Sequence, residues 1–541
     1  MSALRLYVQK PAQRPSPVEA DKALILVGDN WNDYSYRTLY TLYYKKNDKI
    51  REVGRVKILR RGQRSGDSSL KEGRYQNLQL PKELVSLGTD IDYYLRLREL
   101  KLLPRVRTWF NDLSSNPDLA KAFADEEGLK TSLYRYIKRP ADYFDEIRRT
   151  IAAGGNPPDE DAFTLRFTPA GANEPIAFNL GGVEGSKGLR AARPSRRVGV
   201  IIGPNGVGKT QLLARLARVA YAPPAERKEL EAEGVIEGDP AFPNIIAVSY
   251  SSFDNFAPPA LDGDDRDELK ADLAEGRGRY AYLGLRDPAG LLDPGTAQPR
   301  LRTQDELATA FQGYIERIRE LDRFSVFAEI MQPVLEETSF AQYSGIPQAE
   351  DEDEFARDEV RERQLEGLLS PDPSLAFLKL SSGHKIVLHQ LAGLTAMLQR
   401  HGLVLIDEPE THLHPPLLAA LMSSIRRLLG RQRAYAIVAT HSPVVVQEAL
   451  AKQVVILAGR DPTIAVPPSI ETYGENVGAL SREVFGFSPT AGDYRHTLNR
   501  MVRQFDTIED VEEELAARLS SQALAHVVAA FARKAAEEQE K

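Results

Sequence analysis

The sequence predicts an α/β protein built around a parallel β-sheet that is buried on both faces. Five short apolar runs are separated by stretches of helical pattern, and uninterrupted apolar strands of this kind are typical of parallel sheets. A glycine-rich loop follows the first run, and a pair of carboxylates follows the third. The runs are GVII (199–202), IIAVS (245–249), LVLI (403–406), YAIVA (435–439) and VVIL (454–457).

Composition sets outer limits on the function. The 541 residues include 70 Lys and Arg against 77 Asp and Glu, a net charge of -7, so the chain is not a general polycation. Cysteine is absent, which excludes disulfides, zinc–thiolate sites, iron–sulfur clusters and thiol catalysis. The first histidine is His384. No apolar run approaches a membrane helix or a signal peptide, so we expect a soluble cytoplasmic protein.

The glycine-rich loop has the spacing G-x-x-x-x-G-K-T and stands between an apolar strand and a helical pattern. Its glycines let backbone N–H groups turn toward phosphate oxygens, and the following helix presents its positive end. Lys209 would bridge the β- and γ-phosphates of a nucleotide, and Thr210 would ligate Mg²⁺. An accidental glycine-rich turn is the alternative, which the order of strand, loop and helix disfavours. The residues expected to contact ATP here are Gly203, Pro204, Asn205, Gly206, Val207, Gly208, Lys209, Thr210 and Gln211.

The third run continues as LVLIDEPE (403–410), a buried strand that ends in two carboxylates. Asp407 is placed to hold Mg²⁺, and Glu408 is placed to polarise the water that attacks the γ-phosphate. An apolar strand ending in Asp-Glu often arises by chance, but here it accompanies the phosphate loop.

Two further motifs complete the pattern: LSSGHK (380–385) begins an amphipathic helix, and ATHSP (439–443) follows the fourth run. With them the chain resembles ABC-type ATPases of the branch that contains the Rad50, SMC, RecF and overcoming-lysogenisation-defect proteins. The spacings agree with that family: 407 − 381 = 26 residues from the signature to the first carboxylate, and 441 − 407 = 34 to the histidine.

The resemblance implies an ATP-hydrolysing head that dimerises by sandwiching two nucleotides. The signature residues Ser381, Ser382 and Gly383 would complete the site of the other subunit, and His441 would sense the γ-phosphate. Catalysis would then depend on Glu408, His441 and Lys209, with Mg²⁺ held by Thr210 and Asp407.

The sequence departs from the family in three places. The second strand runs IIAVSYSSFDNF without the usual glutamine, which leaves Ser252, Asp254 and Asn255 as replacements. His384 stands where a glutamine is common in the signature, and the phosphate loop lies far from the start of the chain. His412 and His414 could be metal ligands, but they coincide with the family's subunit-interface loop, and that interpretation is favoured.

The domain plan that follows has six parts. They are a β-rich N-terminal domain (1–105), a helical connector (106–155), an ATPase lobe with the phosphate loop (160–256), a helical and acidic insertion (257–379), a second ATPase lobe (380–490) and a helical C-terminal tail (491–541).

The lengths of the segments between and after the motifs exclude several activities of the family. Lys209 and Ser381 are 381 − 209 = 172 residues apart, too few for the long coiled coil of Rad50 or SMC. One phosphate loop excludes a two-cassette protein. Only 541 − 441 = 100 residues follow His441, without an Asp-x-Asp pair or an HNH constellation, so we expect no nuclease in this chain.

The favoured function for such a head is the regulation of a separately encoded effector protein. The segment ETYGENVGALSREVFGF (471–487) resembles ATPase subunits of prokaryotic anti-phage defence systems, the Septu and retron-associated ATPases, which pair with a separate nuclease. A helix that packs on the ATPase core is an equally good interpretation of this segment. The alternative functions are a RecF-like, ATP-gated DNA-binding or repair factor and a scaffold that uses nucleotide only for assembly.

Basic residues gather at 45–64, where nine Lys or Arg and two acidic residues give a local charge of 9 − 2 = +7. A hairpin with this charge could contact DNA through Lys57, Arg60, Arg61 and Arg64, and a solvated hairpin face is the alternative. Two more charged runs are the arginines at 190, 193, 196 and 197, which could serve nucleotide or DNA, and an acidic stretch at 350–362, interpreted as a linker.

Overall fold

The chain divides into two compact units, Met1–Glu475 and Asn476–Lys541. The computed structural model describes most of both units. The described residues are 4–12, 14–29, 36–47, 49–135, 137, 139–152, 163–181, 197–224, 226–238, 240, 242–251, 259, 266, 269–270, 273, 278–287, 290, 292, 300–344, 354–460, 463–484 and 494–539. Ser252, Asp254, Asn255 and the arginines at 190, 193 and 196 lie outside them.

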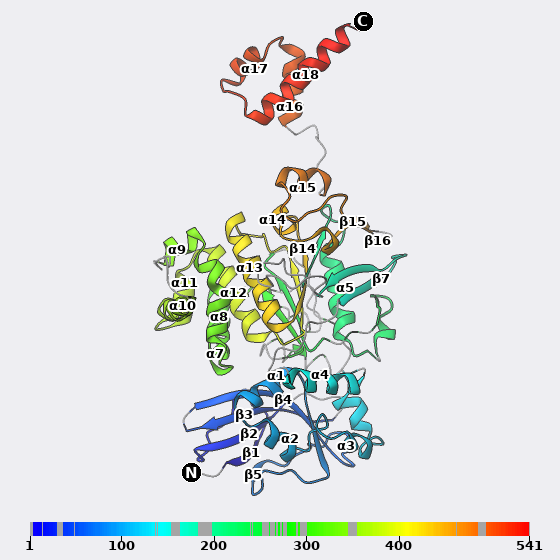
Figure 1. Ribbon diagram of the computed structural model, residues 1–541, viewed down its shortest axis with the longest axis vertical. Coiled ribbons are helices and arrows are strands. Elements are labelled where there is room, and N and C mark those ends of the chain that lie inside the picture. Colours follow the sequence, from blue (N-terminus) through cyan, green and yellow to red (C-terminus); the bar gives the residue numbers. More distant parts are fainter. Residues whose placement is uncertain are drawn as a thin grey trace. The chain divides into compact units, whose positions relative to one another are not determined.

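The centre of the first unit is a seven-stranded sheet in the order β12-β11-β13-β14-β9-β15-β16 (Figure 1). The strands β12, β11, β13, β14, β9 and β15 pair in parallel with one another in that order, and β16 at the edge pairs antiparallel with β15. All five apolar runs form strands here, which confirms the predicted parallel sheet. The strands are β9 (Val198–Ile202), β11 (Ile245–Ser249), β12 (Tyr280–Gly284), β13 (Leu403–Asp407), β14 (Tyr435–Ala439), β15 (Val454–Arg460) and β16 (Thr463–Val466).

Helices cover both faces of this sheet, which explains its uninterrupted apolar strands. On one face Ile201, Leu405 and Ile437 pack into a common core with Leu213 and Leu216 of α5 (Lys209–Tyr221). Figure 1 shows α12 (Ser382–Met397) and α13 (Pro415–Gln432) on the opposite side from α5. Every residue of β9, β11, β13 and β14 is buried.

Strand β12 was not predicted, because it lies inside the segment 257–379 that was expected to hold loops, helices and acidic residues. All five of its residues are buried, and it extends the sheet by parallel pairing with β11. Helix α12 approaches it closely: a Cβ added at Gly393 would lie 2.5 Å from a methyl group of Leu283. Tertiary packing therefore makes this short aromatic segment a strand.

A three-stranded sheet in the order β10-β7-β8 joins the same core through Phe167 and Phe178. Its strands are β7 (Phe163–Pro169), β8 (Ile176–Leu180) and β10 (Gly234–Ile236). A 3-10 turn (Arg227–Leu230) lies between α5 and β10. The helix α14 (Pro443–Gln447) and a second 3-10 turn (Ala451–Gln453) lie between β14 and β15.

The N-terminal domain is a six-stranded sheet in the order β5-β1-β2-β3-β4-β6, with helices after it. The strands are β1 (Arg5–Gln9), β2 (Lys22–Gly28), β3 (Leu39–Lys46), β4 (Lys49–Arg60), β5 (Gly73–Tyr75) and β6 (Leu84–Gly88); the helices are α1 (Ile91–Glu99), α2 (Leu103–Trp109), α3 (Pro117–Ala122), a π-turn (Leu129–Leu133) and α4 (Pro140–Ala152).

The described residues between β12 and α12 are mostly helical. α7 packs against α11 and α12, and α8 packs against α13. α10 spans the end of the acidic run 350–362, so this part of the expected linker is helix instead. The helices are α7 (Gln304–Glu320), α8 (Phe324–Leu335), α9 (Thr338–Ser344), α10 (Glu354–Leu369) and α11 (Pro373–Lys379).

The second unit is helical, as expected of the tail. Leu498, Val502, Val511 and Val527 form its small core. Its helices are α15 (Val477–Glu483), α16 (Tyr494–Gln504), α17 (Ile508–Leu515) and α18 (Ser521–Gln539). Among the helices within the described ranges of the whole chain, none is both long and apolar enough to cross a membrane.

Buried ion pairs connect the N-terminal sheet to the helical insertion. Glu52 on β4, whose side chain is 5% exposed, accepts two hydrogen bonds from the guanidinium of Arg317 on α7, at 3.0 and 3.3 Å. Arg317 also donates to the carbonyl of Ala396 near the end of α12. Asp92 on α1 accepts from Arg323 at 2.9 Å, and Arg323 donates to two more carbonyls of the same helix end. The N-terminal domain is thus bonded to the helix that begins with the signature.

This junction predicts an asymmetry between two arginines. Arg317→Met leaves the buried Glu52 carboxylate without its main partner and should cost about 3 kcal/mol of the free energy of unfolding. Arg14→Met removes an exposed pair of the same junction, in which Arg14 and Glu316 are 60% and 41% exposed, and should cost less than about 1 kcal/mol. Urea unfolding of the two variants measures both values, and equal losses would show that burial does not set the strength of the junction.

Candidate functional site

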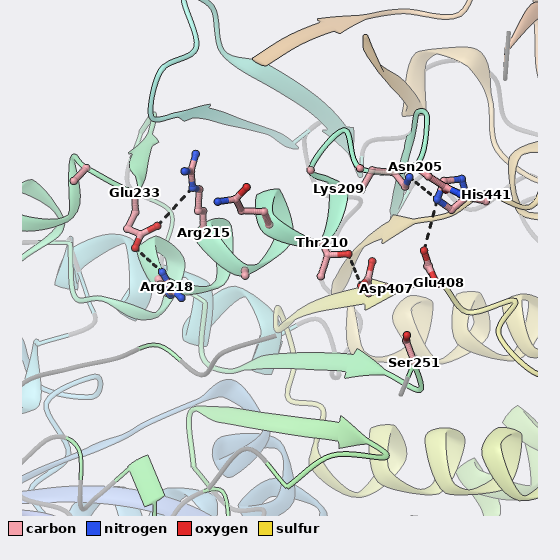
Figure 2. Close-up of a pocket in the computed structure, with 15 residues that line it drawn as sticks. Asn205, Lys209, Thr210, Arg215, Arg218, Glu233, Ser251, Asp407, Glu408 and His441 are labelled. Carbon is pink, nitrogen blue, oxygen red and sulfur yellow. Dashed lines mark hydrogen bonds and ion pairs between the residues drawn. The ribbon is translucent and has the colours of Figure 1, made fainter. Parts of the chain in front are cut away.

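The carboxyl ends of β9, β13 and β14 meet at one edge of the central sheet, and a cavity of about 850 Å³ opens there (Figure 2). This edge is where open parallel sheets bind their ligands. Nine of the predicted site residues line the cavity: Asn205, Gly206, Gly208, Lys209, Thr210, Gln211, Asp407, Glu408 and His441.

The phosphate loop owes its conformation to its glycines. Gly203, Gly206 and Gly208 have φ values of 155°, 78° and 101°, a region that residues with a side chain rarely adopt. A Cβ on Gly203 would also lie 2.6 Å from the carbonyl oxygen of Leu457 on β15. The loop therefore turns tightly out of β9, and α5 begins directly at Lys209 with its N-terminal N–H groups toward the cavity.

Lys209 is the centre of a hydrogen-bonded group. Its ammonium donates to the carbonyls of Gly203 at 3.0 Å and Pro204 at 3.3 Å, and lies 2.6 Å from Nε2 of His441. Because an ammonium only donates, His441 accepts through Nε2 and is neutral in this arrangement. Burial lowers the pKa of Lys209, although Glu408 and two further carboxylates act in the opposite direction. Burial and the Lys209 charge likewise lower the pKa of His441.

Thr210 and Asp407 lie together as the sequence predicts. The Thr210 hydroxyl donates to Oδ2 of Asp407 at 2.8 Å, which bonds the start of α5 to the end of β13 (Figure 2). Asp407 is 3% exposed. A hydroxyl and a carboxylate beside a phosphate loop form the oxygen-rich donor set that Mg²⁺ prefers, so the residues present fit this ion.

Glu408 faces the same histidine. Its Oε1 lies 3.6 Å from Nε2 of His441, and its backbone N–H donates to the carbonyl of Ala439 on β14. Its φ of 47° is left-handed, an unfavourable conformation for a residue with a side chain that costs on the order of 1 kcal/mol. The backbone turn directs the carboxylate into the cavity, while β13 and β14 remain paired up to this point.

Glu410 is a residue beside the cavity that the sequence reasoning did not name. Its carboxylate accepts from the Thr440 hydroxyl at 2.8 Å and from the backbone N–H of His441 at 2.5 Å, so it fixes the loop that carries the histidine. Burial raises the pKa of Glu410. The third carboxylate of DEPE, three residues after Asp407, was the available signal.

The sequence reasoning also did not name the residues at the other end of the cavity. Arg218 on α5 bonds Glu233 at 2.5 Å, and Arg215 lies 3.8 Å from the same carboxylate. Ser251 lines the cavity where the family's glutamine was expected, directly before the undescribed Ser252. Figure 2 shows the two arginines apart from the group formed by Lys209, His441 and Glu408. The arginines follow the phosphate loop at helical spacing, a pattern too general to single them out.

The signature residues lie outside this cavity. Ser381, Ser382 and Gly383 are not among its described lining residues, and both serines are exposed. Ser381 caps the N-terminus of α12, where its side chain accepts from the N–H of His384. The exposed helix start therefore offers N–H and hydroxyl donors to solvent.

The histidines near the signature pack together. His384 is 5% exposed, and its Nε2 lies 3.2 Å from the Ser339 hydroxyl, which also contacts Nε2 of His414 at 3.1 Å. His414 caps α13 by accepting the N–H of Leu417 through Nδ1. In the described part of the chain no group of three or more His, Asp or Glu could hold a metal ion.

The structure corrects one predicted DNA contact. Lys57 is 6% exposed and donates to the carbonyl of Ser132 at 2.8 Å, so it is part of the interior and not of a binding surface. Arg60 pairs with Asp67, and Arg61 donates to Ala122. Residues 56–59 are all buried at the end of β4, and the sequence alone did not show that Lys57 is covered on its face of the sheet.

Comparison with known proteins locates the chain in a family. Residues 307–447 match the domain family described as "AAA domain, putative AbiEii toxin, Type IV TA system", a span that holds the signature, the carboxylate pair and the histidine but not the phosphate loop. Similar solved structures include the ADP conformation of an ATP-binding cassette of an ABC transporter (12% identity, 59% of this chain and 95% of that chain, TM-score 0.26) and an SMC head bound to the C-winged helix domain of ScpA (16%, 57% and 98%, TM-score 0.22).

The fold itself is established by its own elements: the glycine-rich loop between β9 and α5, at the carboxyl edge of a parallel sheet, is the arrangement of a P-loop protein. The sequence comparison is much stronger. Protein ea59 of Escherichia phage lambda is 31% identical over 510 residues, which cover 90% of each chain. This chain therefore belongs to the same protein family as ea59 of phage lambda.

Proposed function

We propose that the protein is an Mg²⁺-dependent ATPase. The observation that supports this best is that Lys209, Thr210, Asp407, Glu408 and His441 line one cavity although 441 − 209 = 232 residues separate the first from the last. These are the cation, the metal-binding oxygens, the base and the sensor that phosphoryl transfer to water requires.

Each residue has a distinct task in this proposal. Lys209 and the N–H groups of the loop bind the phosphates, while Thr210 and Asp407 would hold Mg²⁺, which would neutralise phosphate charge. Water attacks the γ-phosphorus as the bond to the ADP oxygen breaks, and Glu408 accepts the proton of the water. The γ-phosphate takes the place of His441 as the partner of Lys209, which couples nucleotide binding to the loop that Glu410 fixes.

The proposal includes a homodimer in which each cavity is closed by the partner. The signature residues do not line the cavity of their own chain, and their exposed position at the start of α12 suits a phosphate presented by a second copy. In a two-fold dimer each site would then combine one phosphate loop with the other subunit's Ser381.

Glu408→Gln should abolish turnover without abolishing ATP binding, because the amide cannot accept the proton. We expect hydrolysis to fall by about 10²–10⁴-fold, the usual contribution of a general base. Phosphate release and size-exclusion chromatography with ATP measure rate and dimerisation, and the variant should accumulate as an ATP-bound dimer. Glu329→Gln, a half-buried carboxylate of α8 that pairs with Arg431 and does not line the cavity, is the matched control. Hydrolysis by Glu408→Gln at the parent rate would overturn the assignment.

Mixing two inactive variants tests whether the signature acts across the dimer. Lys209→Met disables the phosphate loop and Ser381→Arg blocks the signature, so neither homodimer should hydrolyse ATP. A mixed dimer keeps one intact site, and random mixing should restore about a quarter of the parent sites. No recovery, with mixed dimers demonstrated by two affinity tags, would contradict the trans arrangement.

The biological role we propose is regulation of a separately encoded effector, a nuclease, in defence against phages. The matching domain family is described as a putative toxin of a toxin–antitoxin system, and such a system has two components. The ea59 relative is carried by a phage, which suits a role in competition between phages. A RecF-like factor that binds DNA without an effector is the second candidate, favoured by the basic groove described below.

A plating assay separates these roles. Expression of the chain with its native neighbouring genes should lower the plating efficiency of a sensitive phage, and Lys209→Met should abolish the effect, because ATP binding is lost. Lys228→Met, an exposed lysine of the same lobe, should retain it. If the chain alone protects as fully as the chain with its neighbours, no separate effector is needed.

A further inference from the structure

A second cavity, of about 670 Å³, lies at the tip of the β3–β4 hairpin in the N-terminal domain. Four cationic side chains line it together with Tyr44, and Glu99 is the carboxylate among its described lining residues. The lining residues are Tyr44, Lys46, Asn47, Lys49, Arg51, Glu99, Leu100 and Lys101. We call this cavity the tip groove.

The register of the sheet explains why the cations gather. Lys46 on β3 stands directly opposite Lys49 on β4 and opposite Lys22 on β2, so three lysines face one another across adjacent strands. Arg51 stands opposite Tyr44 on the same face. Like charges in such pairs repel each other and destabilise the sheet. A bound anion would remove this repulsion. The cluster of like charges does not stabilise the hairpin itself, so binding an anion is the use that it serves.

The groove continues the face of the sheet that α1 covers. Tyr44 packs partly against the apolar core shared with α1, and the side chains at 46, 49 and 51 lie beyond the end of that core. α1 ends at Glu99, and Lys101 follows with a left-handed φ of 58°, which closes the groove with a further exposed cation. Lys45 points to the other face, where it donates to the carbonyl of Val18.

We propose that the tip groove binds single-stranded nucleic acid. A positively charged groove with an aromatic side chain is the arrangement that holds a strand by its phosphates and stacks a base. The volume is that of a small-ligand site, roughly 300–1,000 Å³, which admits a few nucleotides of one strand but not a duplex. The pair of Arg51 with Asp322, at 2.8 Å and with both side chains exposed, is one that a phosphate can displace.

This site differs from the surface predicted from sequence. Arg60, at the far end of β4, is 60 − 49 = 11 residues from Lys49, roughly 36 Å along an extended strand. Arg61 and Arg64 follow it. The test below uses neither nucleotide nor Mg²⁺, so its outcome is separate from that of the proposed ATPase.

The test is binding of a fluorescent 15-residue oligo(dT) to the full chain, without nucleotide or Mg²⁺, from 50 to 200 mM salt. Lys46→Glu/Lys49→Glu/Lys101→Glu changes exposed residues only and should lose about tenfold or more in affinity at the lowest salt. The slope of log affinity against log salt should flatten by about 2, since each phosphate contact with a single strand contributes about 0.7. Lys71→Glu/Arg74→Glu/Lys82→Glu, three exposed cations outside every surface considered for nucleic acid, is the matched control on the same domain and should bind like the parent.

Three competitors define the ligand. Unlabelled oligo(dT) should displace the probe, whereas dTMP and a 15-base-pair duplex should do so only at much higher concentrations. Failure of the parent to bind, equal binding by the groove variant, or loss in the control variant instead would each overturn the proposal. Displacement by dTMP as effective as by oligo(dT), or by duplex more effective than by the single strand, would overturn the assignment to a strand. The melting temperatures of both variants check that they are folded.

Discussion

The parallel pairing of β9 with β14, and of β14 with β13, is the constraint on which the rest of the site depends. Strand β14 lies between the strand that leads into the phosphate loop and the strand that ends in Asp407. This order sets the two loops one strand apart and places the His441 loop between them. The Thr210–Asp407 hydrogen bond and the contact of Lys209 with His441 then follow from strand order, because all three strands end at the same edge.

The same edge concentrates opposite charges in a partly buried space. Lys209 faces Glu408 and Asp407, and its hydrogen bond to His441 keeps the imidazole neutral. Burial acts on each group in the direction that disfavours its charge: it raises the pKa of Glu410 and lowers the pKa of Lys209. In the proposed ATPase, an incoming phosphate would replace the carbonyls and His441 as the partner of Lys209, and the histidine loop would respond to that change.

The N-terminal domain is bonded to the C-terminal end of α12, the helix that begins with the signature. Glu52 and Asp92 hold Arg317 and Arg323, and both arginines bond carbonyls at the end of α12, whose first residues are the signature. Glu52 is next to Arg51, which lines the tip groove. A ligand bound by Arg51 would therefore contact the sequence neighbour of Glu52. Glu52 is hydrogen-bonded to Arg317, and Arg317 is hydrogen-bonded to the end of the signature helix.

The sequence by itself determined the parallel sheet, the phosphate loop, the carboxylate pair and the histidine, because each depends on short-range spacing: apolar runs of strand length and glycines at fixed offsets. It did not determine β12, whose pairing with β11 and cover by α12 exist only in the folded chain. Nor did it determine the exposure of the basic hairpin. Lys57 and Lys46 are equally charged in the sequence, but sheet register and the helices after the sheet bury the first and leave the second at an open groove. Glu410 was equally hidden, since its partners at 440 and 441 lie on the neighbouring strand's loop. Residues that act through partners distant in the chain are decided by tertiary packing, and spacing along the chain carries no record of those partners.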